Sequence, residues 1–209
     1  YIPEFIFEML YIRGMCIGRL PNLHEDVISN HQRLLECAIE IVKCTTINDE
    51  LIQRLKEQKL LLKTYLSTQS RKVQKEIYNE YFEISNTYQT YIRESNLKTR
   101  EKWLIRYASF LMKANIVADL LDKLHILERG YQILNAQKDN HPIKYLKAAC
   151  NLAGDYMWRD QFEISTNILQ EAIIFIENRK WFPYWGIIYQ MHIFSRLYGE
   201  NTSSPRDYI

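Results

Sequence analysis

Between Asn22 and Arg129 the chain contains neither glycine nor proline. Hairpins and long loops use those two residues for unusual backbone angles, so such a gap favours helices joined by short polar turns. Apolar residues along 73–91 recur every three or four positions, which is the helical period. Strict alternation of apolar and polar residues, the signature of a strand, extends over no useful length. The sequence therefore predicts an all-α fold.

Polar breaks divide the chain into about nine helices. Clear breaks fall at residues 45–49, 94–96 and 138–142. Asn48 or Asp49 would cap the third helix, and Pro142 suits a first helical turn. We expect the last helix to end near Gly199.

No shift in composition marks a domain boundary, so we expect a single helical domain over residues 1–199. Within it, residues 1–96 would form irregular long hairpins and residues 100–198 would form repeats. Residues 200–209 are mostly polar, and we expect them to be a flexible tail. The chain opens on Tyr1 rather than Met, so we expect it to be a fragment or a processed product.

The composition is that of an ordinary soluble protein, with 209 residues, 47% of them hydrophobic and 25% charged. A formal charge of +2 dictates neither a nucleic-acid nor a membrane partner. The longest uncharged run, 181–195, is shorter than the roughly 20 apolar residues that span a bilayer. We expect an intracellular protein with no membrane partner.

The four cysteines show neither metal-site nor disulfide spacing. They are Cys16, Cys37, Cys44 and Cys150. We expect each to be a small buried hydrophobe in a reducing compartment.

Residues 151–172 carry an ordered pattern of large, small and aromatic side chains. In order these are Leu152, Ala153, Tyr156, Phe162, Ser165, Leu169 and Ala172. The pattern resembles the tetratricopeptide repeat (TPR), in which helix A supplies the first three and helix B the last four. Antiparallel helices approach closely only where small residues such as Ala153 and Ser165 meet.

A second match follows at Gly186, thirty-three residues after Ala153, against a usual period of roughly 34. Gly186 lies between Trp185 and Tyr189 in the same large, small, aromatic order. The resemblance covers about residues 143–198, and residues 100–137 follow it more loosely. It implies a TPR-like α-solenoid, with small side chains at 153, 165 and 186 letting neighbouring hairpins pack closely.

No motif for catalysis, metal binding or a cofactor occurs in the chain. The histidines lack His-Glu-x-x-His spacing, and no phosphate-binding glycine loop or nucleophile elbow is present. We expect His31 and His125 to be core or rim residues. The paired acids Asp49 and Glu50 stand at a helix start, where the helix dipole explains them. We therefore expect a protein that is not an enzyme.

A solenoid of this kind has a curved inner surface lined by its successive A helices. The inward-facing candidates are Lys102, Arg106, Lys113, Lys147, Asn151, Met157, Trp158, Lys180 and Tyr184. A mildly basic groove with Met and Trp anchors would suit an acidic or amphipathic segment of a partner. In some members of the family a Lys, Asn and Arg set binds a terminal carboxylate; Lys147, Asn151 and Arg106 resemble it. The further Asn is missing, so we predict no such clamp.

A basic segment offers an alternative interface. Its members are Arg54, Lys56, Lys59, Lys63, Arg71, Lys72 and Lys75. They could bind nucleic acid or an acidic partner, or form a solvated helix face. An aromatic row follows, consisting of Tyr78, Tyr81, Phe82, Tyr88 and Tyr91. Its spacing favours a packed helix face over a platform for stacked bases.

We therefore expect a non-catalytic scaffold that docks a partner protein or peptide within a larger complex. One alternative is the peptide-receptor domain of a bacterial TPR-type transcriptional regulator, which would carry a DNA-binding module before Tyr1. Another is a nucleic-acid-binding helical protein that uses residues 54–75.

Overall fold

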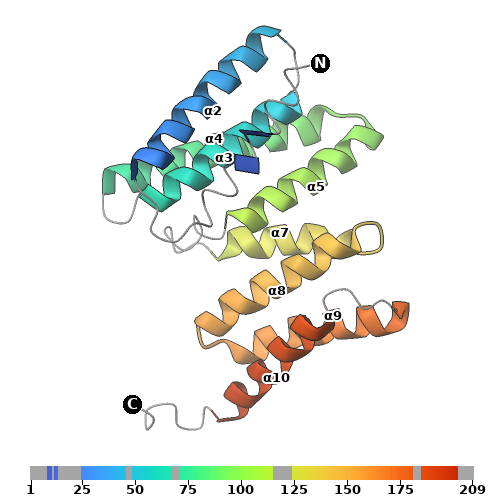
Figure 1. Cartoon of the computed structure of the whole chain (residues 1–209). Helices are drawn as coiled ribbons and strands as arrows, with labels where there is room; N and C mark the ends of the chain where they lie inside the picture. Colours follow the sequence, from blue (N-terminus) through green and yellow to red (C-terminus); the bar gives the residue numbers. More distant parts are fainter. Residues whose placement is uncertain are drawn as a thin grey trace. The chain divides into compact units, whose positions relative to one another are not determined.

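The computed structural model describes residues 9–10, 12–13, 25–45, 49–66, 71–114, 124–180 and 185–201. These residues form eight helices and no strand, so the predicted all-α fold is confirmed for them (Figure 1). The helices are α2 (Glu25–Thr45), α3 (Asp49–Leu66), α4 (Arg71–Glu94), α5 (Leu97–Lys113), α7 (His125–Ala136), α8 (Pro142–Trp158), α9 (Phe162–Arg179) and α10 (Trp185–Asn201). Over the same residues, none of the helices is both long and apolar enough to cross a membrane.

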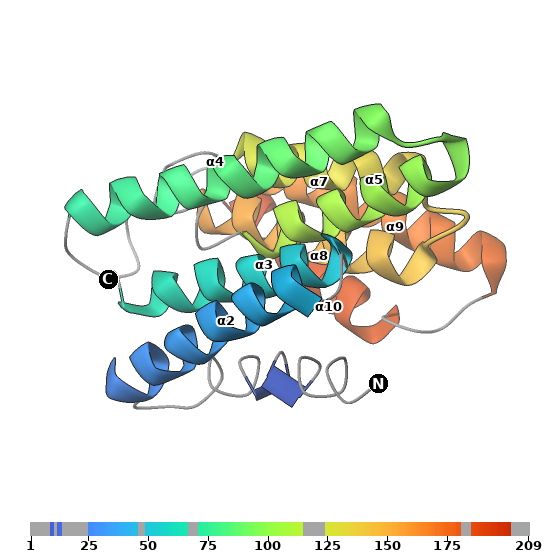
Figure 2. The same cartoon turned by 90° about the horizontal axis from the view of Figure 1, so that it is seen from above.

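The helices belong to two compact units, residues 1–123 and 124–209. In the first unit α2 packs on α3, α3 on α4, and α4 on α5 (Figures 1 and 2). In the second, α7 packs on α8, α8 on α9 and α9 on α10, and α10 also contacts α8. Packing between sequence neighbours is what a helical solenoid requires. The single domain over 1–199 stays a prediction, and residues 202–209 of the expected tail lie outside the described residues.

The polar breaks are where the sequence predicts them. The side chain of Asn96 accepts a hydrogen bond from the backbone N–H of Thr99 at 3.1 Å, which caps the first turn of α5. Pro142 occupies the first turn of α8. α3 begins at Asp49, while Asn48 lies outside the described residues. The last helix extends to Asn201, two residues beyond the expected end.

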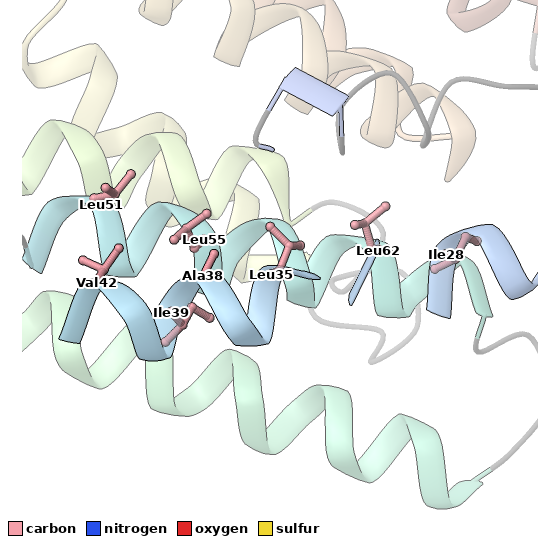
Figure 3. Packing of buried hydrophobic residues seen from close by; sticks show 8 residues of the cluster. All are labelled: Ile28, Leu35, Ala38, Ile39, Val42, Leu51, Leu55 and Leu62. Carbon is pink, nitrogen blue, oxygen red and sulfur yellow. The ribbon is translucent and has the colours of Figure 1, made fainter. Parts of the chain in front are cut away.

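Aliphatic side chains hold α2 and α3 together in the first unit. Figure 3 shows the cluster, which consists of Ile28, Leu35, Ala38, Ile39 and Val42 from α2 with Leu51, Leu55 and Leu62 from α3. All eight are buried, and their spacing of three, four and seven residues places each set on one face of its helix. His31 is buried on the same helix, as expected.

Aromatic side chains hold α4 and α5 together. The ring of Tyr88 is completely buried, with its centroid 5.7 Å from Tyr107 and 5.9 Å from Phe110. Tyr91 stacks on Trp103 at 4.6 Å. The predicted packed face is thus confirmed for Tyr88, but it is wrong for Phe82, which is exposed. Phe82 lies on the side of α4 away from α5 and stacks only on its own-helix neighbour Tyr78 among the ring pairs of the described residues.

Small side chains lie between α8 and α9, as the repeat pattern predicts. Ala153, Ser165 and Ala172 are completely buried. The large positions of the pattern, Leu152 and Leu169, are buried beside them. This arrangement allows the two helices to pack closely. Membership of the repeat family stays a prediction.

The expectation for Gly186 is wrong, because this residue is exposed. Within the described residues, no heavy atom lies within 4 Å of the position that a Cβ would take there. α10 approaches α9 nearer its other end, where the Ser195 hydroxyl donates to the Phe162 carbonyl at 2.9 Å. A Cβ at Gly199 would lie 3.1 Å from the Cβ of Phe162. The close approach is therefore made by Ser195 and Gly199.

The cysteines also differ from expectation. Cys37 and Cys44 are exposed on α2, and Cys150 is half-buried on α8. The two exposed thiols lie away from the α2 face that carries Leu35 and Val42, which fills the contact with α3. Burial raises the pKa of Cys150 to about 11. Cys16 lies outside the described residues.

Candidate partner-binding surface

Three predicted partner-binding residues of the first unit are engaged within the chain. Lys102 and Arg106 of α5 both form ion pairs with Glu50 of α3. Lys113, also on α5, has its Nζ 3.8 Å from a carboxylate oxygen of Glu57. These side chains bridge α3 and α5, so a partner would have to compete with Glu50 and Glu57 for them.

The two α3 acids respond to burial in opposite ways. Burial by itself would raise the pKa of Glu50, but the hydrogen bond from Lys102 and the charge of Arg106 outweigh it and lower the pKa. Glu57 is more deeply buried, and burial raises its pKa although Lys113 opposes the shift. The Tyr88 hydroxyl donates a hydrogen bond to the Glu57 carboxylate.

Sequence reasoning did not find these acids as partners of the basic residues. The position of Glu50 at a helix start is explained by the helix dipole, and Glu57 is the only acid between Arg54 and Lys75. Their spacing of seven residues places both on one face of α3, which was the available signal.

The lysines of the predicted nucleic-acid segment are matched by acids on neighbouring helices. Lys56 pairs with Glu83 at 3.0 Å, and Lys59 pairs with Glu36 at 2.7 Å. Lys63 lies 3.0 Å from Glu76 and 2.8 Å from Glu80. Each distance is measured between a lysine nitrogen and a carboxylate oxygen, and each pair joins α3 to α2 or α4.

This pairing lowers the positive potential of the segment. Burial alone would lower the pKa of Lys63, but its hydrogen bonds to Glu80 and Glu76 outweigh burial and raise the pKa. Lys75 is exposed on α4, whereas the side chains of Arg71 and Lys72 lie outside the described residues. Nucleic-acid binding by this segment stays a prediction, and ion pairs within the chain engage Lys56, Lys59 and Lys63.

Candidate metal ligands among the described residues are histidines, cysteines and carboxylates. Throughout the part of the chain that the structure describes, no three His, Cys, Asp or Glu side chains come together as ligands would. Burial, together with the charge of Arg13, lowers the pKa of His31.

On α8, three predicted partner-binding residues share one exposed face. They are Lys147, Asn151 and Trp158, at spacings of four and seven residues. Trp158 is 90% exposed, the largest value among the exposed apolar side chains of the described residues. Met157 is half-buried, because it lies toward the packed side of the helix.

α10 lies directly beside that face (Figure 1). A Cβ at Gly154 of α8 would lie 3.8 Å from the terminal methyl of Met191 on α10. Ile188 and Ser195 of α10 are buried, and Ser195 bonds to Phe162 and Thr166 of α9. The exposed side of α10 therefore lies away from the buried Ile188 and Ser195, and α10 approaches α8 at Gly154.

That side of α10 is apolar. Its side chains Ile187, Ile193, Phe194, Leu197 and Tyr198 are each about half exposed, and the ring of Tyr198 also stacks on Phe162 of α9 with the centroids 6.0 Å apart. The rings of Phe194 and Tyr198 lie 4.2 Å apart, which makes the row continuous. We call Lys147, Asn151 and Trp158 with these five residues the α8–α10 surface. Sequence reasoning missed the α10 residues because it aligned this helix on Gly186; the long uncharged run 181–195 was the signal.

Of the remaining two candidates, only Lys180 lies among the described residues. Lys180 follows the last turn of α9, is exposed, and has a left-handed backbone with φ of 51°. Tyr184 lies outside the described residues. A role for either in binding stays a prediction.

The chain was compared with families and proteins already known. No family model, no curated protein and no solved structure matches it.

Proposed function

We propose that this chain is a non-catalytic interaction module that binds a segment of another protein on the α8–α10 surface. The observation that carries the proposal is the row of half-exposed apolar side chains along α10, together with the highly exposed Trp158 on α8. Contiguous exposed apolar patches with polar edges are typical of protein–protein interaction sites. Aromatic anchors such as Trp158 and Phe194 supply much of the binding free energy in such interfaces.

The charges beside the row indicate which segment would bind. Lys144 and Lys147 on α8 and Arg196 on α10 outnumber the acids of the two helices, Asp155 and Glu200. An amphipathic helix could place its apolar side on Phe194 and Leu197, as in other helix-in-groove complexes. Acidic residues on its flank would then lie near Lys147. The proposed partner segment is therefore amphipathic and acidic.

A TPR-like solenoid is the architecture that we propose for the module. The packing of sequence neighbours and the buried small residues Ala153 and Ser165 support it. We also propose that the protein works as a subunit of a larger intracellular complex. Its free thiols at Cys37, Cys44 and Cys150 support a reducing compartment.

Photocrosslinking can test the proposed surface directly. A photoreactive amino acid would replace Phe194, and in a matched control it would replace Ile174, an equally exposed residue of α9. After irradiation in cells, we expect residue 194 to form a crosslink to a specific protein that residue 174 does not form.

The affinity of that protein is then measured with purified components. Charge reversal in Lys147→Glu combined with Trp158→Ala should raise the dissociation constant about tenfold or more, and Ile174→Ala should leave it unchanged. An unchanged affinity for the double variant would remove this surface as the binding site.

A further inference from the structure

α2 carries two apolar rows, and only one of them faces the core. The buried row contains Ile28, Leu35 and Val42 (Figure 3). The second row contains Val27, Leu34 and Ile41, which are 37%, 41% and 51% exposed. Both rows repeat every seven residues. The helix thus has an additional apolar face after its contact with α3 is complete.

The exposed row follows the heptad pattern of a two-helix seam. Val27, Leu34 and Ile41 take the a positions. The d positions are Asn30, Cys37 and Cys44, three residues further on in each heptad, and all three are exposed. A seven-residue repeat of this kind is what a second, nearly parallel or antiparallel helix packs against.

The charges beside the exposed row would complement the charges beside the same row in a second copy of the helix. Arg33 and Glu40 both stand at the g position, immediately before Leu34 and Ile41, and both are exposed. The opposite flank is closed by the buried side chains His31 and Ala38. A partner helix would therefore meet one positive and one negative charge along a single open edge.

We propose that α2 pairs with α2 of a second copy of this chain in antiparallel orientation. In that arrangement an a residue faces a d residue, so Leu34 packs on Cys37 of the second copy and Val27 on Cys44. The same register places Arg33 beside Glu40 of the second copy, and Glu40 beside its Arg33. Two symmetric ion pairs then close the open edge.

The parallel alternative lacks this complementarity. In a parallel pair each g residue faces the e residue of the next heptad, so Arg33 would face Ala38 and Glu40 would face Thr45. Within one chain Glu40 pairs with Lys43 at 2.7 Å, but both side chains are exposed and such pairs contribute little to stability. Glu40 can therefore exchange Lys43 for Arg33 of the second copy.

A seam of one helix from each copy is short, and it falls near or below the roughly 1,200 Å² at which stable interfaces begin. We therefore expect a weak dimer with a dissociation constant on the order of micromolar. Sedimentation velocity of the chain under reducing conditions, over a wide range of concentrations, would measure it. A chain that stays monomeric at the highest concentration reached would overturn the proposal.

Leu34→Asp should shift the chain to the monomer without changing its helical circular dichroism. Phe82→Asp, which alters an equally apolar exposed residue on α4, should leave the dimer intact. Equal loss in both variants would overturn the assignment to α2.

Because Leu34→Asp could disturb folding, a charge exchange provides an independent test. Arg33→Glu should raise the dissociation constant about tenfold, and Arg33→Glu combined with Glu40→Arg should restore it to within about threefold. Failure of the exchange to restore dimerisation would contradict the antiparallel register.

Orientation is tested by thiol–disulfide exchange with oxidised glutathione, in which two protein thiols form one disulfide and two molecules of reduced glutathione are released. In the antiparallel seam Leu34→Cys should give a rapid crosslink to Cys37 of the second copy. The unaltered chain should crosslink slowly, because its own thiols face Leu34 and Val27. Rapid crosslinking between Cys37 and its counterpart in the unaltered chain would overturn the antiparallel arrangement.

Discussion

The hydroxyl of Tyr88 on α4 donates a hydrogen bond to the buried carboxylate of Glu57 on α3. The same carboxylate lies 3.8 Å from Nζ of Lys113 on α5. One acidic side chain therefore connects three successive helices of the first unit. Since a buried carboxylate is costly unless it is hydrogen-bonded and paired, the stability of this unit depends on both partners.

Tyr88→Phe removes the donor and leaves Glu57 with Lys113 alone. We expect the free energy of unfolding to fall by about 1–3 kcal/mol, the usual cost of an unsatisfied buried acceptor. Urea denaturation followed by circular dichroism measures it. Tyr189→Phe is the matched control, because its hydroxyl donates to the exposed Glu177 and its loss should cost much less. Equal losses in the two variants would contradict the role given to Tyr88.

Glu57 makes stability fall as the pH rises. Burial raises its pKa in the folded protein above the ordinary value near 4.5, so below pH 4.5 its contribution is fully present. As the pH rises above 4.5, Glu57 ionises in the unfolded chain before it ionises in the folded chain. Its contribution to the free energy of unfolding therefore decreases until the pH has passed the folded pKa. Glu57→Gln removes this dependence. The free energy of unfolding of this variant, compared with that of the unaltered chain, should therefore improve with rising pH. Unfolding free energies at several pH values test this, and a constant or declining difference would exclude it.

Glu50 should show the opposite dependence. Lys102 and Arg106 lower its pKa despite burial, so its contribution is present above pH 4.5 and disappears as the pH falls through the folded pKa. Glu50→Gln should cost about 1–3 kcal/mol at neutral pH and progressively less in acid. Glu94→Gln is the control, because Glu94 is exposed and its ion pair with the exposed Arg93 is long, at 3.7 Å. A loss that persists unchanged in acid would show that the ion pairs with Glu50 are not its cause.

Two small residues of the repeat pattern should respond in opposite ways. Ala153 is completely buried between α8 and α9, so Ala153→Leu should destabilise the second unit by about 1–3 kcal/mol through overpacking. Gly186 is an exposed helical residue with open space at its Cβ position, so Gly186→Ala should stabilise by up to about 1 kcal/mol. Thermal unfolding of both variants measures the effects. Destabilisation by Gly186→Ala would mean that α10 packs closely at this residue.

The sequence predicts much of the helical framework, because the signals involved are local. The absence of Gly and Pro between Asn22 and Arg129, the polar break at 94–96 and Pro142 each act within about one helical turn. The buried Ala153 and Ser165 follow from the spacing of one hairpin. Gly186 could not be judged in this way, since its burial depends on where α10 crosses α9.

The candidate surface was harder to predict because it also depends on how the helices pack on one another. The basic residues Lys102 and Arg106 look available in the sequence, but they are satisfied by Glu50, which lies about fifty positions away on another helix. Exposure of the Phe194 row depends on which side of α10 its neighbours cover. Neither property has a local signature, so helix faces were predictable and the pairing between helices was not.

The central claim is that another protein covers the α8–α10 surface. Hydrogen–deuterium exchange of the free chain and of its complex with the crosslinked partner tests this most directly. We expect slower exchange on binding at the amides of α10 around Phe194 and of the last turn of α8 around Trp158, with α7 unchanged. Slower exchange confined to α7 and the outer face of α9 around Ile174, with α10 unaffected, would contradict the claim.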